Sequence, residues 1–243
     1  MSWLYAFVEK GENRFAKLGV AEDHYHDRFA MTQQCNPIPM EIAATWRFPG
    51  KQDARRCESE LKRKKIFPRL GIGGPEWFST SVEAIHASRP FSDLLNELGG
   101  VRHPSLKFSR AFAESLNIGS KDFGGSRYRP HLYLISHEPS TGTCKLALSC
   151  YNWPTVLAHY VTYNPRLLRV AGRWSFKNDL AGNAFFEKLT RQLGSHRVNP
   201  LNWFKMEPEE MAALVTQMGG TRYPRTNPID DRVNYTKNRV PIN

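Results

Sequence analysis

The feature that most constrains this chain is an internal repeat. When the sequence is laid on itself with a shift of 128 positions, twelve of the sixty residues from 4 to 63 are identical without a gap. Unrelated sequences of ordinary composition would give roughly three or four such identities. Later blocks keep the same order at smaller shifts of 126 and 120, which indicates short deletions in loops: Trp77-Phe78 matches Trp203-Phe204, and residues 99–104 match 219–224. The chain therefore predicts two similar units in tandem.

The repeat also sets the expected boundaries. A length of 243 residues suits two small units. We expect the units at 1–104 and 131–224, a basic linker at 105–130 and a C-terminal tail at 225–243. Within the linker, residues 107–116 suit a short helix.

Apolar runs and breaks predict the elements of one unit. Two short apolar runs around a polar turn indicate a β-hairpin, and Pro37 and Pro39 end the helix that follows. Sparse apolar positions at helical spacing indicate a second helix within a charged stretch. The expected elements are strands at 4–8 and 16–21, a helix at 23–34 capped by Asp23, a strand at 41–48, a helix at 52–66, a short strand or turn at 76–78 and a helix at 80–98. This order predicts an α+β fold in which each unit is a small antiparallel three-stranded sheet flanked by helices.

Charge and composition narrow the classes of partner. The net charge is +11 and the pI is near 9.6, which favours a polyanion such as nucleic acid. The densest basic cluster, 62–65, is equally compatible with a solvated helix face. No run of about 18 apolar residues is present, which predicts no transmembrane helix. The N-terminus lacks a basic start, and the four cysteines are scattered without a CxxC pair, so we expect a reduced, cytoplasmic setting without zinc or disulfides.

Five short motifs in the first unit together resemble the GIY-YIG nuclease family, in particular its phage-associated branch. The first motif is Leu4-Tyr5-Ala6-Phe7-Val8 and the second is Lys17-Leu18-Gly19-Val20, in which Lys17 replaces the family's second tyrosine. The family's helix arginine matches Arg28, and its helix glutamate matches Glu58 in Glu58-Ser59-Glu60-Leu61. The closing motif is Glu76-Trp77-Phe78. The resemblance covers residues 3–98, about 40% of the chain, and implies a metal-dependent endonuclease acting on DNA.

The residue types suit that chemistry. Hydrolysis of a phosphodiester needs a deprotonated water, stabilisation of charge at phosphorus and help for the leaving oxygen. Glu58 offers a hard oxygen ligand for Mg²⁺ or Mn²⁺, and Arg28 can pair with two phosphate oxygens. Tyr5 is the candidate to orient or deprotonate the water. Lys17 holds a phosphate or, if desolvated, acts as base. Residues expected to bind the substrate are Gly19, Arg55, Lys62 and Arg63.

Each of these assignments has a structural alternative. Tyr5 could be a core aromatic, Arg28 a surface helix arginine and Gly19 a plain strand glycine. Glu58 competes with Glu60, which points about 200° away on a helix, so only one of the two faces the site. Glu76 is favoured as a structural residue. Thr32 stands where many family members carry a histidine, so the acid for the leaving group stays unassigned, with His24, Tyr25 and His26 as candidates.

The second copy has lost key residues. At the shift of 128, the positions of Tyr5 and Lys17 keep their residue types, whereas the other site positions change: Gly19 to Ala147, Arg28 to Val156 and Glu58 to Phe186, with Asn202 in place of Glu76. Glu187 lies one residue from Phe186, so a register difference would restore a carboxylate. We expect this unit to fold like the first without cutting, and either to bind DNA, to pack on the first unit or to persist as a spent duplicate. Two other functions remain open for the whole chain: a non-catalytic nucleic-acid-binding protein on a duplicated nuclease scaffold, or a structural protein.

Overall fold

The computed structural model describes residues 2–22, 25–71, 74–103, 129–149, 153–199 and 201–222. The chain divides into two compact units, and a short stretch from the second half of the sequence belongs to the first of them. The first unit comprises 1–117 with 160–167, and the second comprises 118–159 with 168–243. Asp23, His24, the expected helix at 107–116 and the tail at 225–243 lie outside the described residues.

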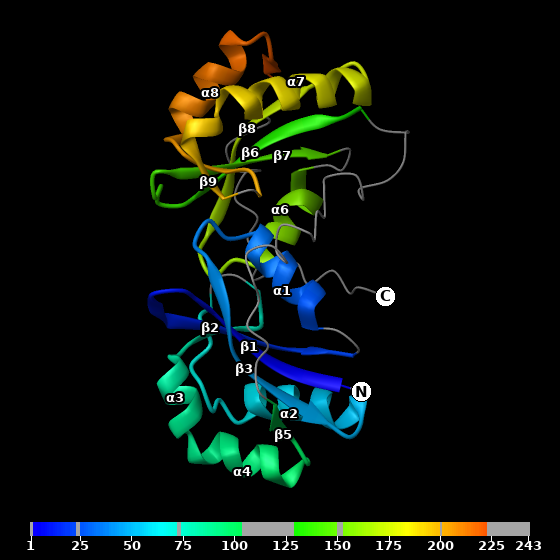
Figure 1. Ribbon diagram of the computed structural model, residues 1–243, viewed down its shortest axis with the longest axis vertical. Coiled ribbons are helices and arrows are strands. Elements are labelled where there is room, and N and C mark those ends of the chain that lie inside the picture. The colour runs from blue at the N-terminus through cyan, green and yellow to red at the C-terminus, as the bar shows by residue number, and fades with distance from the viewer. Residues whose placement is uncertain are drawn as a thin grey trace. The chain divides into compact units, whose positions relative to one another are not determined.

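The first unit is built on an antiparallel sheet of five strands (Figure 1). Its strands are β1 (Ser2–Glu9), β2 (Glu12–Ala21), β3 (Met40–Phe48), β4 (Trp77–Ser79) and β5 (Val101–His103), in the spatial order β4-β2-β1-β3-β5. The hairpin and the third strand expected from the sequence are confirmed. The expectation of a three-stranded sheet is wrong, because β4 and β5 add an edge strand on each side. Each has three residues, too few for a two-residue alternation to be visible in the sequence.

Four helices of the first unit are described: α1 (Tyr25–Gln34), α2 (Lys51–Arg63), α3 (Val82–Ala87) and α4 (Arg89–Glu97). The single helix expected at 80–98 is two helices. Ser88 ends α3 and caps α4, its side chain accepting a hydrogen bond from the amide of Phe91. Pro90 then lies in the first turn of α4, where its missing N–H is tolerated, whereas the same proline within a continuous helix would break it. Helix α2 also ends earlier than expected, since Lys65 adopts a positive φ of 51°.

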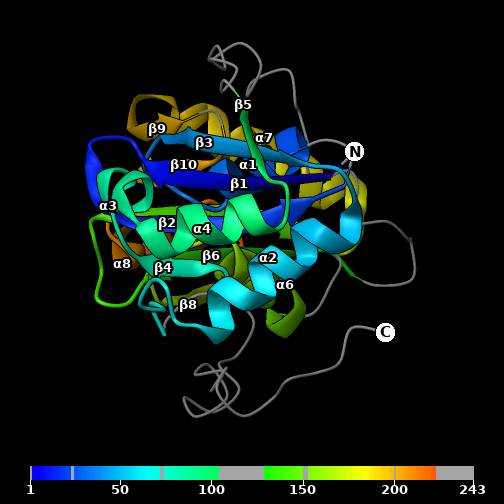
Figure 2. The ribbon, with the colours of Figure 1, turned by 90° about the horizontal axis from the view of Figure 1, so that it is seen from below.

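The two faces of the first sheet carry separate cores. Along β1, Leu4, Ala6 and Val8 belong to a cluster with residues of α2, α3 and α4, and Figure 2 shows α2 and α4 lying across this face. Tyr5 and Phe7 belong to a second cluster with residues of α1, which covers the opposite face (Figure 1). This alternation follows from the two-residue period of a strand, and it places Tyr5 on the α1 side.

The second unit contains an antiparallel sheet of six strands, again more than the three expected. They are β6 (His131–His137), β7 (Thr143–Ser149), β8 (Leu168–Ser175), β9 (Arg197–Asn199), β10 (Trp203–Lys205) and β11 (Thr221–Arg222), in the order β11-β8-β6-β7-β10-β9. Read from β10 to β11, this is the strand order of the first sheet, with β9 added at one edge. The registers also agree at the shift of 128. Leu4 pairs with Trp46 as Leu132 pairs with Trp174, and the central strands of both units break register at equivalent positions.

The helices of the second half are α6 (Trp153–Thr162), α7 (Asp179–Gln192) and α8 (Pro208–Gln217), with a short 3₁₀ turn η2 (Gly194–His196). In α7, Gly182, Phe185 and Leu189 occupy the core-facing positions that Ala54, Cys57 and Leu61 take in α2, each shifted by 128. This agreement fixes the register of the repeat between α2 and α7. Phe186 therefore stands at the position of Glu58, and Glu187 at the exposed position of Ser59.

Two further sequence expectations concern membranes and cysteines. Among the helices in the described ranges, none is both long and apolar enough to span a membrane. Cys35, Cys57 and Cys144 are buried and free, and Cys150 lies outside the described residues.

Candidate active site in the first unit

The floor of the candidate site is the pairing of β1 with β2 on the α1 face of the sheet. Tyr5 lies opposite Gly19 in this ladder. A Cβ placed on Gly19 would lie 2.4 Å from the Tyr5 hydroxyl oxygen and 3.1 Å from Glu76 Oε2. A real Cβ does not tolerate the first distance, so glycine is required for the phenol to lie against the backbone of β2. The structure thus gives Gly19 a close approach to the side chains of Tyr5 and Glu76.

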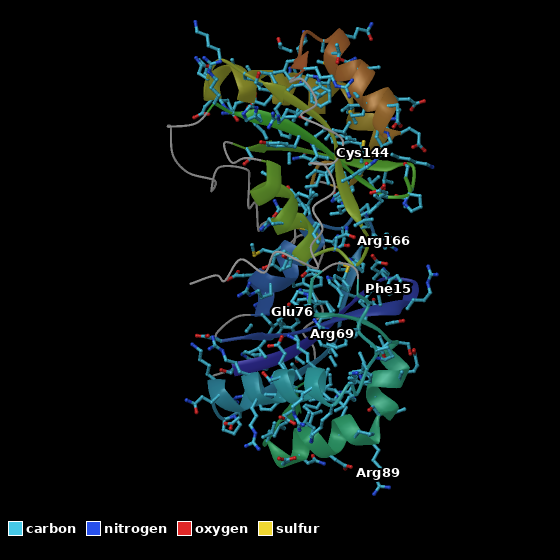
Figure 3. All side chains as sticks on the ribbon, turned by 180° about the vertical axis from the view of Figure 1, so that it is seen from behind. Phe15, Arg69, Glu76, Arg89, Cys144 and Arg166 are labelled. Carbon is cyan, nitrogen blue, oxygen red and sulfur yellow. The ribbon has the colours of Figure 1, made fainter. Side chains whose placement is uncertain are left out.

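A buried ion pair joins Lys17 to Glu76. Lys17 is fully buried, and its Nζ lies 2.5 Å from Glu76 Oε2 and 3.3 Å from the carbonyl oxygen of Thr162. The same ammonium lies 5.8 Å from the ring centroid of Trp77 and 4.9 Å from that of Tyr163. Figure 3 labels Glu76, which comes just before β4. Its partner and the rings hold Lys17 in place, so this lysine is a fixed part of the site floor.

The charges around Glu76 keep its carboxylate ionised. Burial, the largest single effect, raises the pKa of this carboxyl, but Lys17, Lys62 and Arg28 together outweigh it and hold the pKa below the usual value. A carboxylate with a lowered pKa is a poor proton acceptor. Glu76 therefore acts as a counter-ion that positions Lys17, in agreement with the structural role favoured from the sequence.

Arg28 reaches the same site from α1. Its Nη1 donates a hydrogen bond to the hydroxyl oxygen of Tyr163 at 2.9 Å. Arg28 also acts electrostatically on Tyr5 and Glu76, lowering the pKa of each side chain. The guanidinium therefore lies on the side of the sheet that carries Tyr5 and close to Tyr163.

Tyr163 belongs to the stretch 160–167, which is a built-in part of the first unit. Asn36 Nδ2 donates to the carbonyl oxygen of Tyr163 at 2.6 Å, and Asn164 Nδ2 donates to the carbonyl oxygen of Cys35 at 2.7 Å. Both asparagines are fully buried. Farther along, Arg166 (Figure 3) forms a two-pronged ion pair with Glu9, which is only 1% exposed. Buried, hydrogen-bonded polar groups of this kind specify one arrangement, so the backbone of Tyr163 is held firmly.

Both tyrosines of the site stay protonated at neutral pH. Burial and the charge of Glu76 raise the pKa of Tyr5 well above its ordinary value, with a smaller contribution from Glu58 and an opposing one from Arg28. Burial also raises the pKa of Tyr163, although Arg28 opposes the shift. Of the two roles expected for Tyr5, orienting the water is therefore favoured over deprotonating it.

Glu58 and Lys62 approach the site from α2. Their side chains form an ion pair of 2.5 Å one helical turn apart, and they are 18% and 26% exposed. Although α2 packs on the other face of the sheet, the charge of Glu58 acts on Tyr5 and that of Lys62 acts on Glu76. The structure therefore brings Tyr5, Lys17, Gly19 and Arg28 together with Glu76 and Tyr163. Glu58 and Lys62 act on Tyr5 and Glu76 through their charges.

Arg55 and Arg63 are engaged elsewhere. Arg55 bonds Glu22, and the guanidinium of Arg63 chelates the carboxylate of Glu60. From helical geometry, Arg55 lies about 60° around α2 from Glu58, on the same side, while Arg63 lies about 140° away. Arg55 thus flanks the site and Arg63 points away from it. Glu60, bound to Arg63, does not compete with Glu58.

Among the positions considered for the leaving-group acid, the structure describes Thr32, Tyr25 and His26, whereas His24 lies outside the described residues. Thr32 is fully buried and its hydroxyl donates to the carbonyl oxygen of Arg28 at 2.7 Å. Tyr25 is buried and packs edge-on against Trp3 and His26. Sequence reasoning missed Tyr163, the phenol that does reach Arg28. The conserved spacing of Asn36-Pro37 and Asn164-Pro165 in the repeat was the one signal near it.

The donor set suits magnesium bound together with a substrate. Within the described ranges, no group of three or more His, Cys, Asp and Glu side chains is placed to hold a metal ion. Magnesium commonly uses only one or two carboxylates and completes its shell with water and substrate phosphate oxygens. Glu58 provides one such carboxylate, and Lys62 must release it for the ion to bind. The magnesium site at Glu58 therefore stays a prediction.

The equivalent positions in the second unit form no such site. Lys145 is again buried, with Nζ 5.7 Å from the ring centroid of Trp203, and it donates to the carbonyl oxygen of Leu201. Asn202 instead accepts a hydrogen bond from Arg197. Val156 is buried, and Phe186 packs against the core of the second sheet. The second unit keeps the scaffold and lacks the guanidinium and carboxylates.

Comparison of the chain with protein-family models, with curated proteins and with solved structures found no match.

Proposed function

We propose that the first unit is a metal-dependent endonuclease of the GIY-YIG type that hydrolyses phosphodiester bonds in DNA. The observation that supports this most is the place of Arg28, whose guanidinium donates a hydrogen bond to Tyr163 and whose charge acts on Tyr5. The charge of Glu58, on α2, also acts on the phenol of Tyr5. In the proposal, Arg28 pairs with the scissile phosphate and Glu58 holds the metal ion. The net charge of +11 favours a polyanionic substrate.

The proposed roles follow from the contacts. Arg28 pairs with phosphate oxygens and neutralises the charge that grows on them. Tyr5 orients the attacking water with its neutral phenol, and Gly19 leaves room for that ring. Lys17 adds positive charge under the phosphate while Glu76 fixes its position. Magnesium held by Glu58 supplies Lewis acidity and a more acidic bound water.

A nicking assay tests the proposal. Supercoiled plasmid is incubated with the protein and Mg²⁺, and Arg28→Ala and Glu58→Ala are compared with wild type. Each substitution removes a group that stabilises the transition state, so we expect nicking to fall by about 100-fold or more. Glu60→Ala is the matched control, because Glu60 lies on the same helix and is bound to Arg63; it should nick as wild type does.

A non-catalytic nucleic-acid-binding protein is the second candidate. It is favoured by the ion pairs that already neutralise Lys17 and Lys62. In that case wild-type protein leaves the plasmid uncut with Mg²⁺ or Mn²⁺ but retards DNA in a gel, and the retardation weakens steeply as salt is raised. Uncut plasmid without binding would remove both nucleic-acid functions.

A further inference from the structure

Tyr163 brings a side chain from the second half of the chain into the site. Its hydroxyl accepts a hydrogen bond from Arg28 at 2.9 Å, and its ring lies over the ammonium of Lys17, 4.9 Å from centroid to Nζ. It therefore touches the two cations that the proposed function assigns to the phosphate. In the proposed function, this places the phenol beside the two groups that would meet the phosphate.

The position of Tyr163 is fixed by backbone contacts that do not involve its hydroxyl. The side chain of Asn36 donates a hydrogen bond to the carbonyl oxygen of Tyr163. The next residue, Asn164, donates a hydrogen bond to the carbonyl oxygen of Cys35. At the shift of 128, Cys35 corresponds to Tyr163 and Asn36 corresponds to Asn164. The two hydrogen bonds therefore join equivalent positions of the two copies, each asparagine donating to the carbonyl oxygen of the residue before the other asparagine. A residue whose backbone is held in this way has its hydroxyl in position before the substrate binds, which is the preorganisation that electrostatic catalysis requires.

The roles proposed above leave the proton donor for the leaving oxygen unassigned. An alkoxide is a poor leaving group, and a positioned acid typically accelerates such a step by about 100- to 10,000-fold. Thr32 donates to the backbone within α1 and is fully buried. Glu76 is ionised, and Tyr5 lies on the floor beside Gly19.

We propose that Tyr163 is the leaving-group acid of the site, so that the second copy, which has lost its own catalytic residues, supplies one to the first. This inference rests on the proposed function. As the oxygen of water bonds to phosphorus, the bond from phosphorus to the leaving sugar oxygen breaks, and that oxygen takes the phenolic proton of Tyr163. The proton lost by the water passes to solvent. The products are an alcohol and a phosphate monoester.

The surroundings of Tyr163 suit both stages of this transfer. Burial keeps the phenol protonated before the reaction. Afterwards the phenolate lies 2.9 Å from the guanidinium of Arg28, which stabilises the negative charge until solvent returns a proton. The same arginine thus serves the phosphate and the acid.

The test combines Tyr163→Phe with a substrate that needs no acid. The cut site and product ends on ordinary duplex DNA first identify the leaving oxygen. A duplex oligonucleotide is then prepared with sulfur in place of that oxygen, because a thiolate leaves without protonation. We expect Tyr163→Phe to cut ordinary DNA about 100-fold more slowly and the sulfur-containing duplex at the wild-type rate. Phenylalanine keeps the ring over Lys17, and a melting curve checks the fold.

Tyr160→Phe is the matched control, since Tyr160 is another buried tyrosine of the same stretch; it should cut both substrates as wild type does. Four results overturn the inference. Unchanged cutting by Tyr163→Phe removes the acid role alone, and equal loss on both substrates assigns Tyr163 to holding Arg28. Faster cutting means that the phenol competes with the phosphate. Wild-type protein that cuts no DNA overturns the proposed function, and the inference with it.

Discussion

Replacing Glu76 by glutamine should destabilise the first unit by an amount that depends on pH. The substitution keeps the shape of the side chain and removes its charge. Lys17 then remains fully buried with the Thr162 carbonyl and two aromatic rings as partners. None of these carries a compensating negative charge.

The magnitude follows from the burial of the pair. Removing one partner of a buried ion pair typically costs about 3–5 kcal/mol. The Glu76 side chain is 29% exposed, and glutamine still offers an oxygen to Lys17, so the lower end of about 3 kcal/mol applies. That is a large fraction of the total stability of an ordinary domain.

The sign of the pH dependence follows from the lowered pKa of Glu76. In the unfolded chain a glutamate titrates near pH 4.3, about the model-peptide value, and in the folded protein its pKa is lower. The stabilisation is therefore complete above the unfolded pKa and is lost as the pH falls through the folded pKa. Wild type should lose stability in acid more steeply than Glu76→Gln.

Urea unfolding followed by tryptophan fluorescence at pH 7, 5 and 3.5 measures this difference. Glu60→Gln is the control, because Glu60 pairs only with residues of its own helix and its immediate C-terminal end; its effect should be too small to resolve. The reasoning is refuted if Glu76→Gln is as stable as wild type at pH 7. A gap between the two proteins that stays constant from pH 7 to 3.5 would also refute it.

Two other substitutions test the packing of the same unit. Gly19→Ala brings a Cβ to 2.4 Å from the Tyr5 hydroxyl, so we expect the free energy of unfolding, measured in urea, to fall by about 1–3 kcal/mol. The loss should be smaller when Tyr5 is also replaced by leucine. Ala147→Gly, the change in the opposite direction at the equivalent position of the second unit, is the control and should not cause this loss. Glu9→Gln leaves Arg166 without its buried carboxylate. We expect the free energy of unfolding to fall by about 3 kcal/mol, seen as a lower urea midpoint. An unchanged midpoint would mean that this ion pair does not stabilise the attachment of 160–167.

The sequence predicts the central strands because their signal is local. The apolar runs at 4–8 and 16–21 and the alternation along β1 need no knowledge of distant contacts. Residues 76–78 were expected as a short strand or turn, and β4 forms there. The addition of β4 to the sheet, the strand β5 and the break at Ser88 were missed for the opposite reason. Three residues at a sheet edge carry no period, and the cap at Ser88 interrupts an otherwise continuous apolar pattern.

The same difference between local and distant signals applies to the residues of the candidate site. Tyr5, Lys17, Arg28 and Glu58 could be proposed because motif order and spacing in the sequence indicate them. Tyr163 lies 135 residues from Arg28, and no spacing rule spans that separation. Its partner position in the first copy is Cys35, so the repeat could not point to it either.

The stretch 160–167 makes the division between the units different from the division between the repeats. A gene shortened after codon 104 would encode all five sheet strands of the first unit and still lack the stretch 160–167. The shortened polypeptide would leave Asn36 and Glu9 without their partners from that stretch, Tyr163 and Arg166. A fragment cut at the repeat boundary should therefore be less stable than the whole first unit, even though it keeps all five sequence motifs of that unit.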